Sequence, residues 1–352
     1  MHTLTLLVML LLSPPEPVAG GGGKPSPATA MLEKGTALYK QGDTAGALKA
    51  FDAAAKADPS DARPFYLRGV ALEKTGDPAG ALQAYRKAVA LKADFAEAQN
   101  NLGALMLTNA DSVSAARAFE AAVRAKPNYP EAHFNLGVAR DAEGKVPEAV
   151  AAYREAVRQK PADAAYRMNL GVALRKQGDV PGALASLKEA TRLAPKDALV
   201  WTNLGMIQSD AKAYDAAAES LEKAVKLNDG SALAWNRLAR VALRLKQPDR
   251  AAEAAARACK LEPKNAAYAA DLCHVLVEKR DTTAAAKECR TAAALDRQNP
   301  LASYELGKVL VAKGECASAR KELDRFAAMP GIKPEAKAQA AAIAKSCTAP
   351  KK

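Results

Sequence analysis

The tripeptide NLG decides the fold of this chain because it returns at one constant interval. Its copies stand at Asn101–Gly103, Asn135–Gly137, Asn169–Gly171 and Asn203–Gly205, and each begins 34 residues after the one before. A fixed period of about 20 to 50 residues is typical of proteins built from tandem supersecondary units, each too small to bury its own apolar face. The interval therefore predicts a repeat protein.

The repeats run from Ala28 to Lys333 without insertion or deletion. Repeats 1 to 9 occupy residues 28–61, 62–95, 96–129, 130–163, 164–197, 198–231, 232–265, 266–299 and 300–333. Position 8 is small in every repeat, position 20 is always alanine, and position 24 is bulky in repeats 1 to 6. Small residues let two helices approach closely, and a bulky residue fills the space beside them. The pattern predicts one helical hairpin in each repeat.

Glycine, aspartate and proline mark the ends of the expected helices. The stretch QGD at 41–43 and 177–179 ends one helix with glycine and begins the next with an aspartate cap. Prolines in the first turn of second helices are tolerated because no N–H is needed there. Alanine-rich composition with only 5% aromatic residues agrees with many packed helices. Since a single hairpin cannot bury its apolar face, neighbouring hairpins must stack.

These features resemble the tetratricopeptide repeat family, whose pattern is W-x2-L-G-x2-Y, then A-x3-F, then P. WTNLGMIQ from Trp201 carries the first block, and ALQAYRKAV from Ala81 carries the second. The resemblance covers residues 28–333. It implies an all-α fold, a right-handed α-α superhelix (TPR solenoid) of nine helical hairpins whose first helices line a concave groove. Residues 334–347 are expected to form a C-terminal capping helix, followed by a tail at 348–352.

The same resemblance places positions 2, 5, 6, 9, 12 and 13 in the groove. Position 6 holds Asn101, Asn135, Asn169 and Asn203. An amide side chain offers both a donor and an acceptor, so one amide per repeat predicts a row that grips the backbone of an extended peptide. Apolar groove residues expected beside the row are Tyr66, Phe134, Met168 and Met206. The alternative is that the asparagines bridge adjacent helices and the apolar side chains pack against neighbours.

Repeat 7 differs from the others by a basic stripe on its first helix. Arg237, Arg240 and Arg244 fall on one helical face, and Lys308 of repeat 9 shares position 9 with Arg240. The stripe predicts a site for acidic side chains, a C-terminal carboxylate or an anionic polymer. The alternative is ion pairing with Asp271 and Glu305 of the next two repeats. The net charge of +12 favours acidic partners without identifying one.

All five cysteines lie in the C-terminal third of the chain. In hairpin geometry positions 8 and 24 face each other, which would let Cys273 bridge Cys289; Cys316 and Cys347 are a second candidate pair, leaving Cys259 free. The alternative is that all five are reduced, small core residues. No cysteine pair has the spacing of a metal-binding finger, so no metal site is predicted.

Motifs for catalysis are missing from the sequence. It has three histidines and contains no glycine-rich phosphate loop, no G-x-S-x-G and no H-E-x-x-H. We therefore expect a protein that is not an enzyme and that needs no cofactor.

The N-terminus has the pattern of an export signal. The apolar run Leu4–Leu12 precedes SPPEP and the small-residue stretch VAGGGG, in which Val18 and Gly20 suit a cleavage site. We expect a signal peptide at 1–20, a flexible linker at 21–27, and a periplasmic or secreted protein if the host is bacterial. The run is too short to span a membrane, and no cysteine near the cleavage site offers a lipid anchor. A merely apolar start is the alternative, since no Lys or Arg precedes the run.

Together these patterns predict a non-catalytic scaffold for protein–protein interaction. It would bind an extended polypeptide segment in its concave groove and, by analogy with other exported repeat proteins, assist assembly of a cell-envelope complex. The alternative function is binding of an anionic polymer or acidic partner through the repeat 7 stripe; nucleic acid is not the expected partner. Salt separates the two functions, because polymer binding weakens steeply as salt rises.

Overall fold

The computed structural model describes residues 26–347, which form nineteen α-helices and no strand. The predicted all-α repeat fold is thus confirmed. The predicted signal peptide (1–20), residues 21–25 of the predicted linker and the predicted tail (348–352) lie outside the described residues.

The described chain divides into two compact units at Leu193 and Ala194. The N-terminal unit contains α1 (Pro27–Lys40), α2 (Thr44–Ala57), α3 (Ala62–Thr75), α4 (Pro78–Leu91), α5 (Ala96–Thr108), α6 (Ser112–Ala125), α7 (Pro130–Ala142), α8 (Val146–Gln159), α9 (Ala164–Gln177) and α10 (Val180–Leu193). The C-terminal unit contains α11 (Ala198–Asp210), α12 (Tyr214–Leu227), α13 (Ala232–Arg244), α14 (Pro248–Leu261), α15 (Ala266–Glu278), α16 (Thr282–Leu295), α17 (Pro300–Ala312), α18 (Cys316–Ala328) and α19 (Pro334–Ser346).

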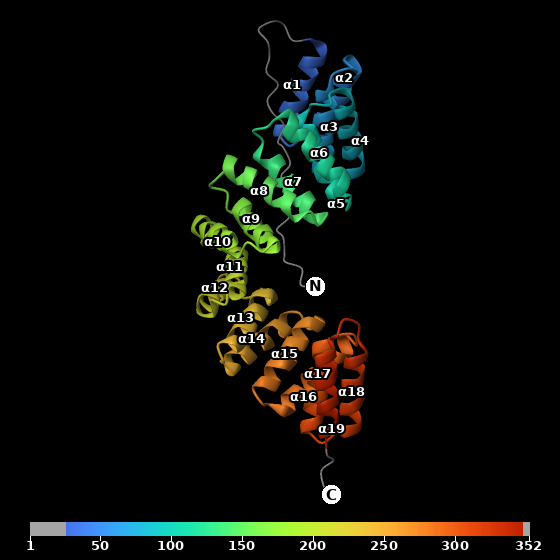
Figure 1. Ribbon diagram of the computed structural model, residues 1–352. Coiled ribbons are helices and arrows are strands. Elements are labelled where there is room, and N and C mark those ends of the chain that lie inside the picture. The colour runs from blue at the N-terminus through green and yellow to red at the C-terminus, as the bar shows by residue number, and fades with distance from the viewer. Residues whose placement is uncertain (1–25, 348–352) are drawn as a thin grey trace. The chain divides into compact units, whose positions relative to one another are not determined.

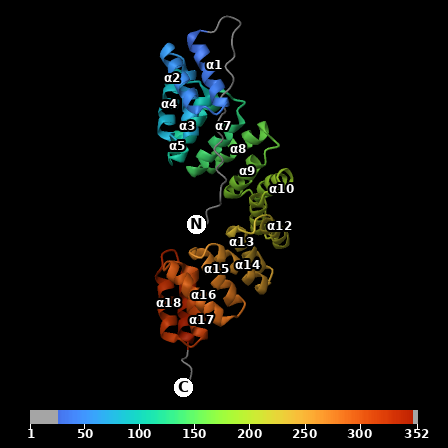
Figure 2. The ribbon, with the colours of Figure 1, turned by 180° about the vertical axis from the view of Figure 1, so that it is seen from behind.

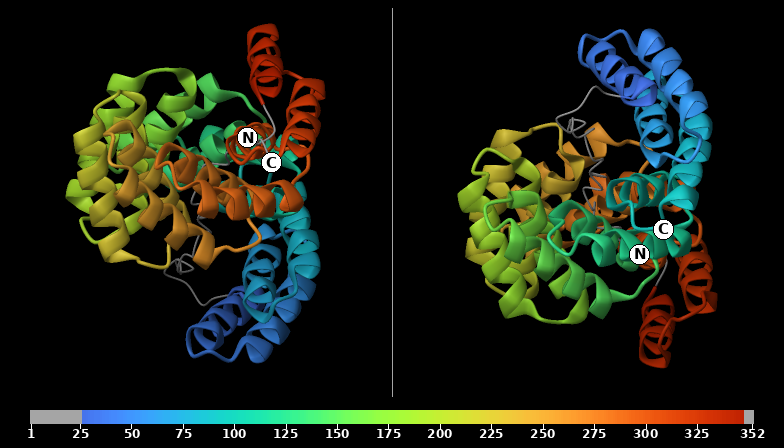
Figure 3. Two further views of the ribbon diagram at one scale, coloured as in Figure 1. Left: turned by 90° about the horizontal axis from the view of Figure 1, so that it is seen from below. Right: turned by 90° about the horizontal axis from the view of Figure 1, so that it is seen from above.

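Within each unit, consecutive helices pack side by side as hairpins in chain order (Figures 1 and 2). Odd-numbered helices up to α17 are the first helices of their repeats, and even-numbered helices are the second. Each second helix also packs against the first helix of the following repeat in its unit. At the C-terminal end, α19 packs on both α17 and α18, as the end-on views show (Figure 3). The stack therefore ends on a helix that has no hairpin partner of its own.

Local sequence sets the helix ends. Asp77 caps α4 by accepting a hydrogen bond from the Gly80 N–H at 2.8 Å, and Asp43 caps α2 in the same way through Gly46. Gly76 ends α3 in the left-handed region at φ 79°. Because glycine enters this region without a steric penalty, it allows the sharp turn into α4.

Each hairpin closes where a small residue of its first helix meets a bulky residue of its second. A Cβ atom added to Gly137 would lie 2.6 Å from the Tyr153 ring, and one added to Gly69 would lie 2.5 Å from the Tyr85 ring. Both tyrosines are fully buried. In repeat 7 the corresponding pair is Ala239 and Ala255, and no large side chain occupies the contact. The core thus changes from aromatic in the first four repeats to alanine-rich near the C-terminus.

Candidate interaction surfaces

The four asparagines predicted to form a peptide-binding row are buried inside the stack. Asn101, Asn135 and Asn169 lie on α5, α7 and α9, Asn203 lies on α11, and none is more than 3% exposed. The expectation that these amides stand open to solvent is therefore wrong. For Asn101 and Asn135 the physical reason is contact with neighbouring helices, since their amides meet Tyr85 of α4 and Asn100 of α5.

Two of the four belong to a hydrogen-bonded chain of side chains. Asn135 Nδ2 donates to Asn100 Oδ1 at 2.9 Å, joining α7 to α5. Asn100 Nδ2 donates to Asn101 Oδ1 at 3.2 Å, and Asn101 Nδ2 donates to the Tyr85 hydroxyl at 3.3 Å. The Tyr85 hydroxyl in turn donates to Glu73 on α3. These contacts match the alternative that the asparagines bridge adjacent helices.

Burial keeps Tyr85 of this hydrogen-bonded series neutral, so that its hydroxyl can donate to Glu73. It raises the pKa of Tyr85 far above its ordinary value, and the nearby Glu73 carboxylate adds to the shift. Burial also raises the pKa of Glu73. Sequence reasoning missed Asn100, although it is the first residue of the NN pair at 100–101. Asn236 of repeat 7, at the same position 5, was missed as well, and its Nδ2 donates to Asp271 Oδ2 at 2.8 Å.

The other two asparagines keep unused hydrogen-bonding atoms. Asn169 Nδ2 donates to the Ala165 carbonyl of its own helix at 2.9 Å, but its Oδ1 has no hydrogen-bond partner among the described residues. Asn203 Nδ2 likewise has no hydrogen-bond partner among residues 26–347. A buried polar atom without a partner costs about 1–3 kcal/mol, so each of these two atoms needs an explanation.

The apolar residues predicted for the groove are core residues, which corrects that expectation too. Tyr66, Phe134, Met168 and Met206 are each at most 5% exposed. The Phe134 ring stacks on Tyr166 of the next repeat with centroids 4.8 Å apart. Such aromatic pairs add stability beyond the area that they bury. These side chains therefore hold successive repeats together.

The basic stripe is only partly assembled as predicted. On α13, Arg240 and Arg244 are exposed and Arg237 is half-buried. Lys308 instead forms an ion pair with Glu305 of its own helix, with Nζ and Oε2 2.9 Å apart. Of the two acidic groups considered as partners for the stripe, Asp271 accepts a hydrogen bond from Asn236, and Glu305 is engaged by Lys308 and His274.

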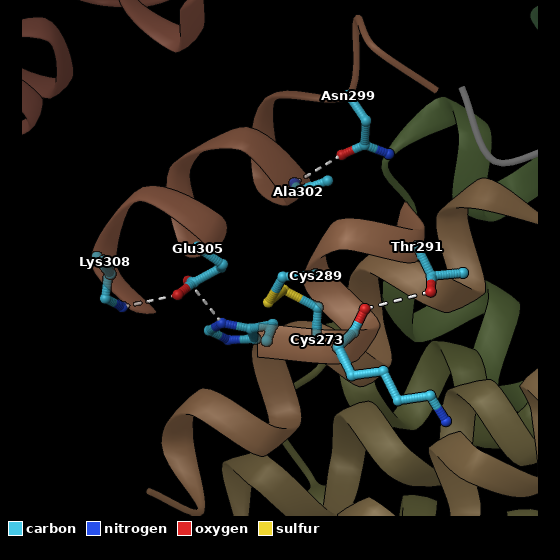
Figure 4. The surroundings of a disulfide bond; sticks show 9 residues. Cys273, Cys289, Thr291, Asn299, Ala302, Glu305 and Lys308 are labelled. Atoms are coloured by element: carbon cyan, nitrogen blue, oxygen red, sulfur yellow. Dashed lines mark hydrogen bonds and ion pairs between the residues drawn. A yellow bond between two sulfur atoms is a disulfide. The ribbon is translucent and has the colours of Figure 1, made fainter. Parts of the chain in front are cut away.

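A buried acid–base contact joins α15 to α17 in the C-terminal unit (Figure 4). His274 Nδ1 lies 2.9 Å from Glu305 Oε1, and the carboxylate side chain is only 3% exposed. The hydrogen bond to Glu305 raises the pKa of His274 above its ordinary value, despite partial burial. Burial alone would raise the pKa of Glu305, but hydrogen bonds from His274 and Lys308 outweigh it and hold this pKa below the ordinary value. The pair therefore favours the charged form of both groups.

Both candidate cysteine pairs are joined in the structure. Cys273 of α15 and Cys289 of α16 form a disulfide with their Cα atoms 4.8 Å apart (Figure 4). Cys316 and Cys347 form a second one with a Cα separation of 5.5 Å, which ties the end of α19 to α18. Cys259 is a free, half-buried thiol, and burial raises its pKa to about 12.

Residues 26–347 contain neither a metal-binding cluster nor a helix that could cross a membrane. No group of three or more His, Cys, Asp or Glu side chains in this range has an arrangement that would hold a metal ion. None of the helices described there combines the length and apolar character that crossing a bilayer requires.

Solved structures with the same fold are numerous. The chain resembles a chain of the APC/C hetero-tetramer Cut9–Hcn1, with 20% identity and a TM-score of 0.56 over 80% of this chain and 55% of that one. It also resembles a tetratricopeptide repeat protein from Parabacteroides merdae, with 17% identity and a TM-score of 0.56 over 71% of this chain and 98% of that one. YrrB, described as a TPR protein with an unusual peptide-binding site, has 24% identity and a TM-score of 0.50 over 57% of this chain and 99% of that one.

Sequence comparison agrees with the structural likeness. No curated protein matches the chain significantly. The family model for the tetratricopeptide repeat, however, matches residues 32–96, 101–164, 139–198, 202–266 and 271–342. These matches cover most of the chain and follow the helical hairpins seen in the structure. The chain therefore belongs to the tetratricopeptide repeat family, whose members are generally scaffolds for protein interaction.

Proposed function

We propose that this chain is a non-catalytic scaffold that binds an extended polypeptide segment along the first helices of its repeats. The observation that carries the proposal is the unused hydrogen-bonding capacity of two amides at position 6. Asn169 keeps an acceptor and Asn203 keeps a donor, each buried and without a partner in the described chain. A peptide backbone offers one N–H and one C=O per residue, which are the groups that these atoms lack.

The proposal assigns different roles to asparagines that look alike in the sequence. Asn101 and Asn135 are structural, because their amides connect first helices within the N-terminal unit. Asn169 in the N-terminal unit and Asn203 in the C-terminal unit each contact a peptide within their own unit. Because both are buried, the peptide must displace neighbouring side chains to reach them, and the hydrogen bonds gained offset part of that cost.

The test starts with 12-residue peptides selected on the wild-type protein from a random library. Affinity is then measured by fluorescence polarisation for Asn169→Ala, Asn203→Ala and the control Asn236→Ala. Each of the first two variants should weaken binding about five- to tenfold, the equivalent of one hydrogen bond of about 1–1.4 kcal/mol. Asn236→Ala should leave affinity unchanged and lower stability, because its amide already donates to Asp271.

Backbone methylation of the peptide separates backbone recognition from side-chain recognition. If the amides bind the backbone, methylating the peptide nitrogen that faces Asn169 should weaken wild-type binding about as much as Asn169→Ala does. In the Asn169→Ala protein, the same methylation should cause no further loss of affinity. Full affinity in both asparagine variants would remove these residues from the mechanism.

We also propose that the protein works outside the reducing cytoplasm, in the assembly of a cell-envelope complex if the host is bacterial. Two disulfides in the C-terminal unit support this location, because such bonds persist in oxidising compartments. The N-terminal mass of protein recovered from the envelope fraction tests it. Loss of residues 1–20 together with one free thiol is expected, whereas an intact N-terminus with five free thiols contradicts export.

A second candidate function is binding of an acidic partner or anionic polymer through α13. It is favoured by the exposure of Arg240 and Arg244, one helical turn apart on the same face. Polyphosphate binding measured from 50 to 300 mM salt distinguishes the two functions. Affinity for the polymer should fall steeply with salt and drop further in Arg244→Glu, whereas the selected peptides should bind almost independently of salt.

A further inference from the structure

A cavity of about 760 Å³ opens in the N-terminal unit where the links between repeats meet. Its wall is formed by the link before α3, by the first turns of α3 and α5, and by the C-terminal ends of α4 and α6. A volume of this size is typical of sites that enclose a ligand group rather than of gaps in packing. Four of its lining residues hold positions predicted from the sequence to face the groove: Arg63, Tyr66 and Leu67 of repeat 2 and Glu97 of repeat 3.

The floor of the cavity is aromatic. The rings of Tyr66 and Phe95 meet with centroids 4.9 Å apart, and Tyr66 is also 5.9 Å from Tyr85 behind it. Leu67 and Leu91 extend this apolar surface. Because Tyr66 and Leu67 are almost wholly buried, a side chain placed on the floor would contact the partly exposed Phe95 ring, against which Tyr66 packs, and Leu91. Removing such an apolar side chain from water is favourable.

The rim of the cavity is charged but balanced. Arg63 pairs with Asp61 at 2.7 Å on one side, and Lys126 pairs with Glu97 at 2.8 Å on the other. The remaining lining charges are one basic residue, Lys92, whose Nζ lies 5.6 Å from the centroid of the Phe95 ring, and one acidic residue, Asp94. Because the lining holds three basic and three acidic groups, it offers no net charge to attract a charged ligand group.

The start of α5 adds one polar feature to the cavity edge. Phe95 occupies its N-cap position and supplies no side-chain hydrogen bond, whereas Asp61 caps α3 through the Arg63 N–H at 2.9 Å. The first N–H groups of a helix have no partner within it. Ala96 and Glu97 of this first turn line the cavity. A carbonyl oxygen placed beside the aromatic floor would therefore find a donor there.

We infer that this cavity is an anchor site for a neutral aromatic or aliphatic side chain of the partner polypeptide. The inference rests on the proposed function, to which it adds the side-chain preference of the partner. Phe95 and Leu91, backed by Tyr66, take the side chain, and the paired rim excludes a charged one. An N–H of the α5 first turn donates a hydrogen bond to the adjacent backbone carbonyl.

Three capped amino acids probe the site directly: the N-acetyl amides of phenylalanine, glutamate and lysine. Saturation-transfer NMR on the full chain should show binding of the phenylalanine probe at millimolar concentration and at least tenfold weaker binding of the two charged probes. Equal or tighter binding of a charged probe would overturn the inference.

A matched pair of variants locates the binding. Ala125 lines the cavity, is exposed and ends α6, so Ala125→Trp should fill the cavity without disturbing the core. Ala57 ends α2 at the same repeat position, is also exposed and lies outside the cavity. Ala125→Trp should weaken the phenylalanine probe at least tenfold, and Ala57→Trp should leave it unchanged. Equal effects in the two variants would place the probe elsewhere and overturn the inference.

The same variants separate this inference from the proposed function. In one outcome, Asn169→Ala weakens the selected peptides, but Ala125→Trp changes the affinity of neither these peptides nor the phenylalanine probe. The inferred anchor site is then wrong, and the proposed peptide binding stands. If the library yields no peptide but Ala125→Trp blocks the phenylalanine probe, the cavity is a site for apolar groups and the proposed function is wrong.

Discussion

The disulfide between Cys273 and Cys289 occupies the contact that a glycine and a bulky side chain make in most other repeats. In repeat 4 that contact pairs Gly137 with Tyr153, and a Cβ on Gly137 would lie 2.6 Å from the ring. In repeat 8 a covalent bond spans the same two positions with the Cα atoms 4.8 Å apart. The helices of both hairpins are thus held together at the same point, by van der Waals packing in one and by a bond in the other.

Removing this disulfide should destabilise the C-terminal unit without preventing its folding. A bridge between residues 16 apart stabilises by about 3 kcal/mol through the entropy of the unfolded chain. The double variant Cys273→Ala with Cys289→Ala recreates the Ala239–Ala255 pair of repeat 7. Urea unfolding under oxidising conditions should show the loss. Under reducing conditions, which also open the Cys316–Cys347 bond in both proteins, the wild type and the double variant should have similar stability. Equal stability of variant and oxidised wild type would contradict a structural role for the bond.

Introducing a methyl group at Gly137 should force the Tyr153 ring out of its place. Overpacking of this kind costs about 1–3 kcal/mol, which thermal unfolding of Gly137→Ala can measure. In a Tyr153→Ala background the same change should be neutral or stabilising, because the ring is gone and alanine favours helix more than glycine. Additive effects in this double-mutant cycle would show that the two residues do not meet.

Between residues 26 and 347, four turns place a residue other than glycine in the left-handed region, and a glycine there should stabilise the fold. Lys212 adopts φ 61° at the turn after α11, where Gly178 adopts φ 91° after α9. A residue with a Cβ pays about 1–2 kcal/mol for this conformation, partly offset by the greater freedom of glycine in the unfolded chain. Lys212→Gly should therefore stabilise by about 0.5–1 kcal/mol, and the reciprocal Gly178→Ala should destabilise. A lower melting temperature for Lys212→Gly would refute the argument.

The contact between His274 and Glu305 should make stability depend on pH. The pKa of His274 is raised above 6.5 in the folded state, so its contribution is complete below pH 6.5 and is lost as pH rises through the raised value. The pKa of Glu305 is lowered below 4.5, so its contribution is present above pH 4.5 and is lost as pH falls through the lowered value. The pair therefore contributes most between these limits.

His274→Gln provides the matching measurement for this pair. The wild-type free energy of unfolding should decline between pH 6 and 8 by under about 1 kcal/mol, since the imidazole is partly exposed to solvent. The variant should show a flatter profile over that interval. Glu278 and Lys308, which also act on the His274 pKa, are unchanged in the variant and serve as the internal control. The same slope in both proteins would mean that another group titrates.

Sequence patterns predicted the repeat architecture well because their causes are local. Glycine before a turn, aspartate at a helix start and a small residue facing a bulky one act within a single hairpin, and a 34-residue period repeats them. Residues that cooperate across repeats were harder to predict. Asn100 and Asn236 were missed because nothing in their own repeats shows that the next first helix brings Asn135 or Asp271 within hydrogen-bonding distance.

The chain by itself determined that it folds into stacked helical hairpins, because helix caps, turn glycines and apolar spacing act over a few neighbouring residues. The tertiary structure decided which contacts are made by the side chains that the sequence pattern singled out. The four asparagines are buried, but only Asn101 and Asn135 bond to neighbouring helices, whereas Asn169 and Asn203 keep unused atoms. The tertiary structure also gathers residues of four helices around a cavity with an aromatic floor. These contacts depend on the distances between residues of different repeats in space, which the spacing along the chain does not give.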